Sequence, residues 1–339
     1  MRITIGILAR NEGGSIGVML ADLARQTLFS RPDSFEIIVY ANDCSDDTAE
    51  RARRALAVGF AKSPVATRVF VTPEGGKTRG WNNLVHHVAN PATDLFVFCD
   101  GDITFARKDA IAQMVTMWET GGTARAVTGN VVKDLHRKPT KTPIDRISLG
   151  LSRDARLPNA LNGSLYVIGG VEARKIWLPV PLPGEDGFLS GMIKTNGFTE
   201  EPVEERVVSP DTPTHYYEAH SLAGYFRHEK RITMGTTING WIMEDLWAHR
   251  LTQHAGSLIR RRNEEDPNWI AGLMREKMGG RRWVVPHRLL TGRLDHLRRL
   301  RPLEAVKRLP FALGATALNL VPVITANREL KRDQAAGFW

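Results

Sequence analysis

The feature that most constrains the fold is the alternation of short apolar runs with amphipathic segments over the first hundred residues. Four β-branched or aromatic runs predict strands, at residues 3–9, 35–40, 68–71 and 95–99. Helical patterns lie between them, and polar loops follow the strands. Because continuous apolar strands that alternate with helices are typical of parallel sheets covered on both faces, the sequence predicts an α/β fold with a mostly parallel, Rossmann-like sheet flanked by helices.

The regular alternation weakens after residue 102, which suggests an internal division. We expect one large domain over residues 1–235, composed of a first half at 1–102 and a second half at 103–235. Residues 236–339 are predicted to form a helical extension. A chain of 339 residues is long enough to bury a sizeable core without disulfides or metals that stabilise the fold.

Charge is distributed unevenly along the chain. The formal net charge is +9, but eleven Lys or Arg residues and only three acids lie between positions 275 and 308. A basic segment attached to a nearly balanced body does not favour a nucleic-acid-binding protein, so no nucleic acid is expected as a partner. Only Cys44 and Cys99 are present, and Cys99 lies in an apolar run, which predicts a reducing, cytoplasmic environment.

Polar loops follow the predicted strands, and in an open parallel sheet these loops converge on one crevice. Asp100 and Asp102 are separated by one glycine directly after the fourth strand. Carboxylate oxygens at this spacing suit a hard cation such as Mn²⁺ or Mg²⁺ that also binds phosphate oxygens of a substrate. A solvated turn is the alternative for such a short motif, but its position after a buried strand favours the metal site.

Several ordered motifs over residues 3–235 resemble the family-two glycosyltransferases, which have the GT-A fold. The segment 8–12 is similar to the family's first nucleotide-binding loop, and the segment 36–48 is similar to its second, although the usual paired Asp is replaced by Ala41 and Asn42. The segment 76–82 resembles the stretch that covers the nucleoside. The resemblance implies that residues 1–102 bind the nucleotide and 103–235 the acceptor. The donor-binding residues it implies are Ala9, Asn11, Glu12, Asn42, Asp43, Lys77, Asn82 and Asp100.

Glu185 and Asp186 match the later acidic motif of the same family. They follow Asp102 by 83 residues (185 − 102), the interval that the resemblance leads us to expect. The family implies that one of them, more often the residue corresponding to Asp186, deprotonates the acceptor hydroxyl in an inverting displacement. Because acids also favour the first turn of a helix, a capping role is compatible with this one.

His228 and Arg231 lie where processive members of the family carry a Gln-x-x-Arg-Trp motif. The position of the Trp is Ile232 here, which favours a single addition over chain polymerisation. Because some related folds use a late His as a further metal ligand, the resemblance makes His228 a candidate for that role and Arg231 a candidate contact for donor phosphate. An ordinary surface position is the alternative for His228.

The basic C-terminal segment has three interpretations: a solvated surface, a nucleic-acid patch, or a region that lies on anionic lipid. We favour peripheral membrane contact through 275–326, because basic residues adjoin an apolar stretch there. Pro310, Asn319 and Pro322 interrupt that stretch, so we expect it to fall short of a spanning helix.

These patterns together predict an inverting, metal-dependent glycosyltransferase. The expected donor is a nucleotide-diphosphate sugar, with uridine as the family's commonest base. The expected acceptor is a hydroxyl group on a lipid-linked molecule or a cell-surface glycan precursor, and the expected location is the cytoplasm or the inner face of the cell membrane. The segment 10–14 lacks the signature of a sugar-phosphate nucleotidyltransferase. A non-catalytic nucleotide-sugar or glycan-binding protein remains as the alternative.

Overall fold

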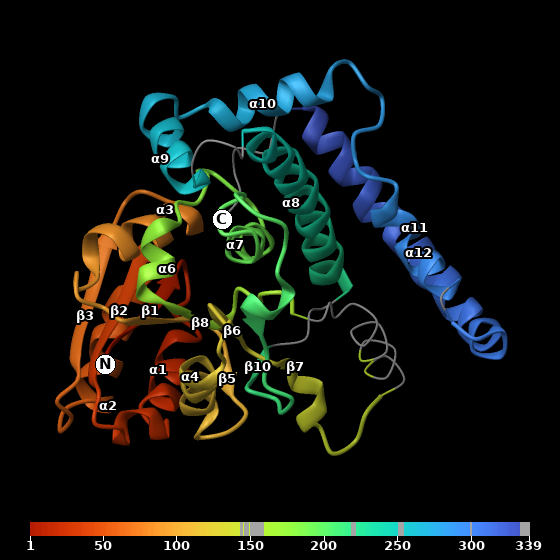
Figure 1. Ribbon diagram of the computed structural model, residues 1–339. Coiled ribbons are helices and arrows are strands. Elements are labelled where there is room, and N and C mark those ends of the chain that lie inside the picture. Colours follow the sequence, from red (N-terminus) through yellow and green to blue (C-terminus); the bar gives the residue numbers. More distant parts are fainter. Residues whose placement is uncertain are drawn as a thin grey trace.

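The computed structural model describes residues 1–142, 145, 149, 159–217, 222–249, 254–298 and 300–332. Figure 1 shows an α/β body from which one long helix and a shorter neighbour project to one side. The body contains the N-terminal two thirds of the chain, and the projecting helices belong to the C-terminal third.

The centre of the body is a seven-stranded sheet with the order β3-β2-β1-β4-β8-β6-β9. Strands β1 to β4 are mutually parallel, whereas β8 runs antiparallel to both of its neighbours. The prediction of a mostly parallel sheet is confirmed. The strands are β1 (Arg2–Ala9), β2 (Ser34–Asn42), β3 (Ala66–Thr72), β4 (Leu95–Asp100), β6 (Ala126–Thr128), β8 (Leu165–Gly169) and β9 (Val207–Val208).

The two faces of this sheet support separate apolar clusters because successive strand side chains point to opposite faces. Ile3, Ile5 and Ile7 pack with helices α1 (Ile16–Leu23), α2 (Thr48–Gly59) and α4 (Ala110–Thr120). Phe96 and Phe98 belong to the other cluster. That cluster includes side chains of α3 (Lys77–Asn83), of α6 (Gly170–Lys175) and of α7 (Glu185–Lys194). Helices therefore cover both faces, as the uninterrupted apolar strands predicted.

A smaller sheet of three short strands lies beside the main one. Its order is β5-β10-β7, with β5 (Thr104–Phe105), β10 (His215–Tyr217) and β7 (Val131–Lys133). The predicted strand at 126–131 is thus divided between two sheets, since β6 ends at Thr128 and β7 begins at Val131. Three 3-10 helices, at Thr27–Ser30, Asp134–Arg137 and Glu204–Arg206, and a π-helical turn at Leu84–Val88 complete the body.

The C-terminal third is helical, as predicted. It contains α8 (Leu222–Ala248), α9 (Ala255–Glu265), α10 (Trp269–Met278), α11 (Arg288–Leu297) and α12 (Pro302–Lys331). The predicted boundary at 235/236 falls inside α8, so one helix belongs to both parts. Side chains of α9, α10 and α12 join the same core cluster as Phe98 of the sheet. The extension is therefore packed against the body through α8 and α10.

The expectation that the apolar C-terminal stretch is too interrupted to span a membrane needs correction. Pro310 and Pro322 lie inside α12, which continues through both of them for 30 residues. By length and composition alone, this helix could cross a membrane. A proline removes one intrahelical hydrogen bond, but packing against neighbouring helices can keep the helix continuous.

Candidate active site

The loops that carry the predicted donor residues meet at one edge of the main sheet. In the parallel register of β1 with its neighbours, Leu8 pairs with Asp100 and Ala9 pairs with Ala41. The strands therefore end at the same level, and the segments after them lie side by side. This arrangement confirms the expectation that the polar loops converge.

Lys77 is the first residue of α3, and it links two of the predicted acidic motifs. Its Nζ lies 2.9 Å from Asp100 Oδ1 and 2.8 Å from Glu185 Oε1. Burial alone would lower the pKa of Lys77, but the two carboxylates outweigh it and hold the pKa well above its usual value. Asp100 and Glu185 lie 23 and 108 positions after Lys77 along the chain, and both pair with its ammonium group.

The start of α3 is fixed by side chains below it. Gly76, with φ of 114°, provides the turn into the helix, a conformation that L side chains rarely adopt. Trp81 is buried and donates from Nε1 to Tyr166 Oη at 2.8 Å. Asn82 donates to the carbonyl of Leu178 at 2.9 Å and accepts from its N–H at 2.8 Å. Because its amide is committed to Leu178, Asn82 anchors α3, and this position does not support the predicted donor contact.

Glu185 and Asp186 form the first turn of α7, directly after Gly184, whose φ is 70°. Burial favours the neutral form of both carboxyls, but only Glu185 has Lys77 as a direct partner. The pKa of Glu185 is lowered because the charge and hydrogen bond of Lys77 outweigh its burial. The pKa of Asp186 is raised, first by burial and then by the negative charge of Glu185. The two adjacent acids are therefore chemically different.

Asp100 and Asp102 differ in their surroundings as well. Burial raises the pKa of Asp100 despite the opposing charge of Lys77, whereas Asp102 is exposed. Glu12 lies close by, since a side chain at Gly101 would approach Glu12 Cγ to 3.2 Å. Burial, and then the charges of Asp102 and Asp100, raise the pKa of Glu12. Carboxylates thus gather around Lys77 at this edge of the sheet.

No group of three or more His, Cys, Asp or Glu side chains in the described ranges could hold a metal ion by itself. Asp100, Asp102 and His228, which lies on α8, therefore do not form such a group in the described structure, and His228 as a metal ligand stays a prediction. The two aspartates alone fit a cation that keeps several positions for water and substrate phosphate oxygens. Such an ion needs only one or two protein carboxylates.

The loops after β1 and β2 contact each other directly. Asn11 and Asp43 both have positive φ, at 56° and 50°. Asn11 Oδ1 accepts a hydrogen bond from the Ser45 N–H at 2.8 Å, and Asp43 forms a 2.6 Å ion pair with Arg10. Asn42 is buried, donates to the Gly76 carbonyl at 3.1 Å, and has an Oδ1 atom without a partner among the described residues. An orphaned buried acceptor of this kind is rare, and a ligand donor would satisfy it.

Arg231 is exposed on α8, and its charge contributes to the lowered pKa of Glu185. This helix passes close to the acidic turn, because Asn239 donates to the Gly184 carbonyl at 2.7 Å. Arg231 therefore lies within electrostatic reach of the site.

His215 is a residue that the sequence did not reveal. Its Nε2 lies 2.7 Å from the Ser164 hydroxyl, and the Ser164 carbonyl accepts the N–H of Asp100 at 2.9 Å. Burial lowers the pKa of His215 to about 3, so this side chain is neutral. Next to Ser164, Gly163 lies against Glu185 and Asp186, to which a side chain at that position would come within 3.3 Å. His215 thus supports the loop between the two acidic motifs, and its partner is 51 residues away with no local pattern to predict it.

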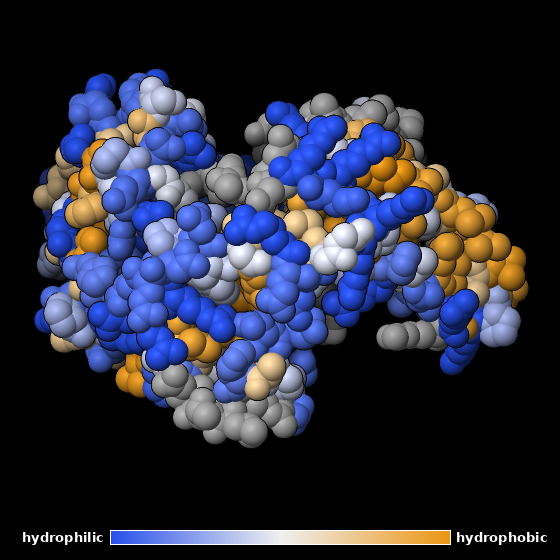
Figure 2. Space-filling view, turned by 90° about the horizontal axis from the view of Figure 1, so that it is seen from above, coloured by the Kyte–Doolittle hydropathy of each residue, from blue (hydrophilic) through white to orange (hydrophobic). Residues whose placement is uncertain are grey.

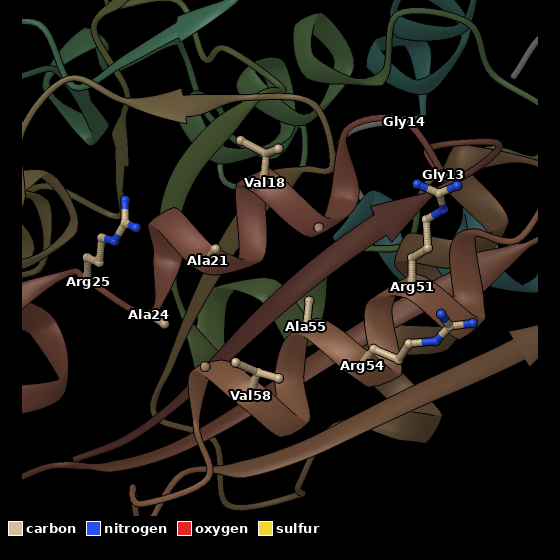
Figure 3. A pocket seen from close by; sticks show the side chains of 12 residues that line it. Gly13, Gly14, Val18, Ala21, Ala24, Arg25, Arg51, Arg54, Ala55 and Val58 are labelled. Carbon is tan, nitrogen blue, oxygen red and sulfur yellow. The ribbon is translucent and has the colours of Figure 1, made fainter.

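A separate hollow lies between α1 and α2, which cover the face of the main sheet opposite to α3 and α7. Figure 3 shows that Val18, Ala21, Ala55 and Val58 line it together with arginines. Arg51 and Arg54 are paired with Asp47 and Glu50 of their own segment. None of the predicted site residues lines this hollow, so it is distinct from the crevice around Lys77.

Comparisons with known proteins agree with this fold. Residues 4–171 match the model of the family described as Glycosyl transferase family 2, and the chain belongs to this family. A stretch of 122 residues is 31% identical to 4,4'-diaponeurosporenoate glycosyltransferase of Staphylococcus aureus, and covers 35% of this chain and 29% of that protein.

Among solved structures, the mannosyltransferase PcManGT from Pyrobaculum calidifontis, in complex with GDP-Man and Mn²⁺, is similar in fold. The TM-score is 0.57 at 16% sequence identity, over 98% of this chain and 87% of that one. This likeness confirms the GT-A fold predicted from the sequence. It extends across the helical C-terminal third, which the family model does not reach.

Proposed function

We propose that this protein is an inverting glycosyltransferase that moves one sugar from a nucleotide-diphosphate sugar to a hydroxyl acceptor. The observation that carries the proposal is the contact of Lys77 with both Asp100 and Glu185. It brings the acidic pair at the end of β4 and the acidic turn of α7 together. A transferase needs this proximity, because the leaving diphosphate and the attacking hydroxyl lie on opposite sides of one sugar carbon.

The donor would lie across the ends of β1, β2 and β4. Asn42 has a buried oxygen that a donor group of the nucleoside would satisfy. Asp100 and Asp102 would hold Mn²⁺ or Mg²⁺, which supplies Lewis-acid stabilisation of the departing diphosphate. The P. calidifontis mannosyltransferase of similar fold was solved with GDP-Man and Mn²⁺, which supports this choice of donor class and cation.

Lys77 would bind the diphosphate with its ammonium group. Its two carboxylate partners hold it at the centre of the crevice, and its raised pKa keeps it charged. A fixed positive charge at this place favours the negative charge that develops on the leaving group. Arg231 would add a second positive charge from α8.

Asp186 would be the general base, and Glu185 would position Lys77. Glu185 is paired with the lysine at 2.8 Å and has a lowered pKa, so it is a weak base. Asp186 has no lysine partner, and its raised pKa makes it the better proton acceptor of the two. Asp186 would take the proton of the acceptor hydroxyl while the oxygen attacks the anomeric carbon.

The acceptor would be a lipid-linked molecule or a precursor of a surface glycan, and the enzyme would act at the inner face of the cell membrane. The basic C-terminal segment supports this location, since anionic lipid attracts Lys and Arg side chains. The acceptor half, residues 103–235, would bind the sugar-accepting group beside α7.

A thermal-shift screen tests the donor site directly. The purified protein is measured with UDP, GDP, CDP and dTDP, each with and without Mn²⁺, because preferential binding to the folded state raises the apparent stability. We expect one nucleotide to raise the midpoint only when Mn²⁺ is present, and Asp102→Ala to abolish this shift. The matched control is Asp266→Ala, an exposed acid on the turn before α10. No shift with any nucleotide would instead support a binding protein of another kind.

A further inference from the structure

Helix α12 is apolar on all sides, but protein covers only one of them. The described residues include sixteen large apolar side chains that are exposed, and nine of these lie on α12. A helix that is apolar all round is normally buried on every side, in a large core or in a membrane. The exposed side of α12 therefore requires an explanation.

The covered side faces the rest of the protein. Ala312, Ala315, Val323 and Leu330 are buried where α12 packs on α8 and α11. Their spacing places them on one side of the helix. Small alanines in the first part of this side allow α11 to lie close along α12.

The adjacent side, about 100° around the helix from the packed one, carries an exposed apolar stripe, which consists of Val306, Leu309, Leu313, Leu320 and Ile324. Successive members are three, four, seven and four positions apart, so they share one face. Each of them is at least 38% exposed, and Val306 is 68% exposed. At 1.5 Å of rise per residue, the stripe is about 27 Å long.

Contacts with the body favour a helix that lies on a bilayer over one that spans it. Glu329 forms a 2.8 Å ion pair with Lys230 of α8, and Asn327 accepts the N–H of Val284 at 2.7 Å. Asn319 accepts a hydrogen bond from Tyr225 at 3.0 Å. These contacts hold the C-terminal half of α12 to α8 and to the segment before α11, an arrangement that presents the side of α12 to a bilayer.

Basic residues flank the stripe at both ends. Exposed Arg298, Arg301 and Lys307 lie near its start, and exposed Arg328 and Lys331 lie near its end. Figure 2 shows the apolar side chains gathered at the end of the molecule formed by α11 and α12, with hydrophilic ones beside them. An apolar stripe with cationic flanks matches the acyl boundary and the anionic headgroups of one leaflet.

We propose that α12 lies in the plane of an anionic lipid bilayer, with the stripe of Val306, Leu309, Leu313, Leu320 and Ile324 buried at the acyl boundary. The inference deepens the membrane contact of the proposed function, although it does not depend on sugar transfer. It also gives the acceptor a route. Helix α8 contacts α12 through Lys230, and the next residue, Arg231, acts on Glu185 of the active site. An acceptor carried on a lipid would thus enter beside α8.

Vesicle sedimentation tests the proposal with the full-length protein. The vesicles contain phosphatidylcholine alone or with one third phosphatidylglycerol, and the test variant is Leu313→Glu combined with Leu320→Glu. The control is Val58→Glu combined with Val18→Glu, which places the same charges on exposed valines of α2 and α1. We expect wild type and control to bind the anionic vesicles, and the test variant to bind at least tenfold more weakly. Raising the salt from 0.1 to 0.5 M should weaken wild-type binding several-fold.

Three results would overturn the inference. Equal binding of the test variant and wild type would remove the stripe from the interface. Resistance of the bound protein to extraction by alkaline carbonate would indicate a spanning helix. A dimer in solution that the test variant converts to a monomer, without vesicle binding by wild type, would assign the stripe to a second copy of the chain.

Thermal shift with Mn²⁺ and nucleotide is measured on the same variant. If vesicle binding is lost but the shift persists, the donor site is intact, so the two proposals can fail separately.

Discussion

The strands of the N-terminal half and the helix pair α11–α12 place apolar side chains in opposite ways. In β1, β2 and β4 nearly every apolar residue is buried, because helices cover both faces of the sheet. On α12 apolar residues of the same types are exposed over most of the helix length. An apolar run therefore predicts that its side chains are buried against a partner. The tertiary structure decides whether this partner is another part of the protein.

The charged side chains of the two regions also differ in whether protein encloses them. In the N-terminal half, Lys77 is enclosed by Asp100 and Glu185, and the pKa of each of these groups is shifted. Along α12, Arg301 and Lys307 are exposed. Enclosed charges shift one another's pKa, whereas salt screens the field of exposed ones.

The largest effect that would sharpen this comparison comes from removing the proposed general base of the body, Asp186. We expect Asp186→Asn to lower the rate of sugar transfer by about 10²–10⁴-fold, because a positioned general base contributes this much. Binding of nucleotide with Mn²⁺ should persist. Leu313→Glu on α12 should leave transfer to a soluble acceptor unchanged. Transfer is measured by release of nucleoside diphosphate, with Glu205→Gln, an exposed acid of the 3-10 turn at Glu204–Arg206, as the matched control. Retention of full transfer by Asp186→Asn would move the base to Glu185.

The next effect concerns stability. Leu20→Ala removes a fully buried side chain of α1, and we expect it to lower the free energy of unfolding by about 2–5 kcal/mol. Leu313→Ala deletes the same atoms from the exposed side of α12 and should change it by less than about 0.5 kcal/mol. Urea unfolding without lipid measures both variants. A large loss with Leu313→Ala would break the comparison, since it would mean that protein covers the stripe.

The smallest effect is a pH dependence of stability that comes from the buried His215 of the body. His215 has a folded pKa of about 3, below its unfolded value of 6.5, because burial disfavours the charged form. As the pH falls below 6.5, the unfolded chain gains a proton that the folded chain does not, so this contribution to stability is lost at about 1.4 kcal/mol per pH unit. His215→Gln should flatten the slope between pH 6.5 and 5 by about this amount. The control His296→Gln changes an exposed residue of α11, and an equal flattening there would contradict the assignment.

Features that depend on a few consecutive residues could be predicted from the sequence, whereas contacts between distant residues could not. The strands β1, β2, β3 and β4 were predicted within two residues at each end, since an apolar run has few alternatives. The acidic pair after β4 was placed correctly at the edge of the sheet for the same reason. By contrast, His215 supports Ser164 across 51 residues, and Asn82 is fixed by a carbonyl 96 residues away. No local spacing encodes such contacts.

The sequence by itself determined the parallel α/β body, the edge at which polar loops gather and the basic character of the C-terminal third. These properties follow from hydrophobic periodicity and charge, which are local. Only the tertiary structure decided that Lys77 stands between Asp100 and Glu185, and that Asp186 remains outside this ion pair. It also decided that α12 continues through two prolines with one face packed and the other bare. The physical reason is that pKa shifts and burial depend on distances between segments, and the packing of the whole chain sets those distances.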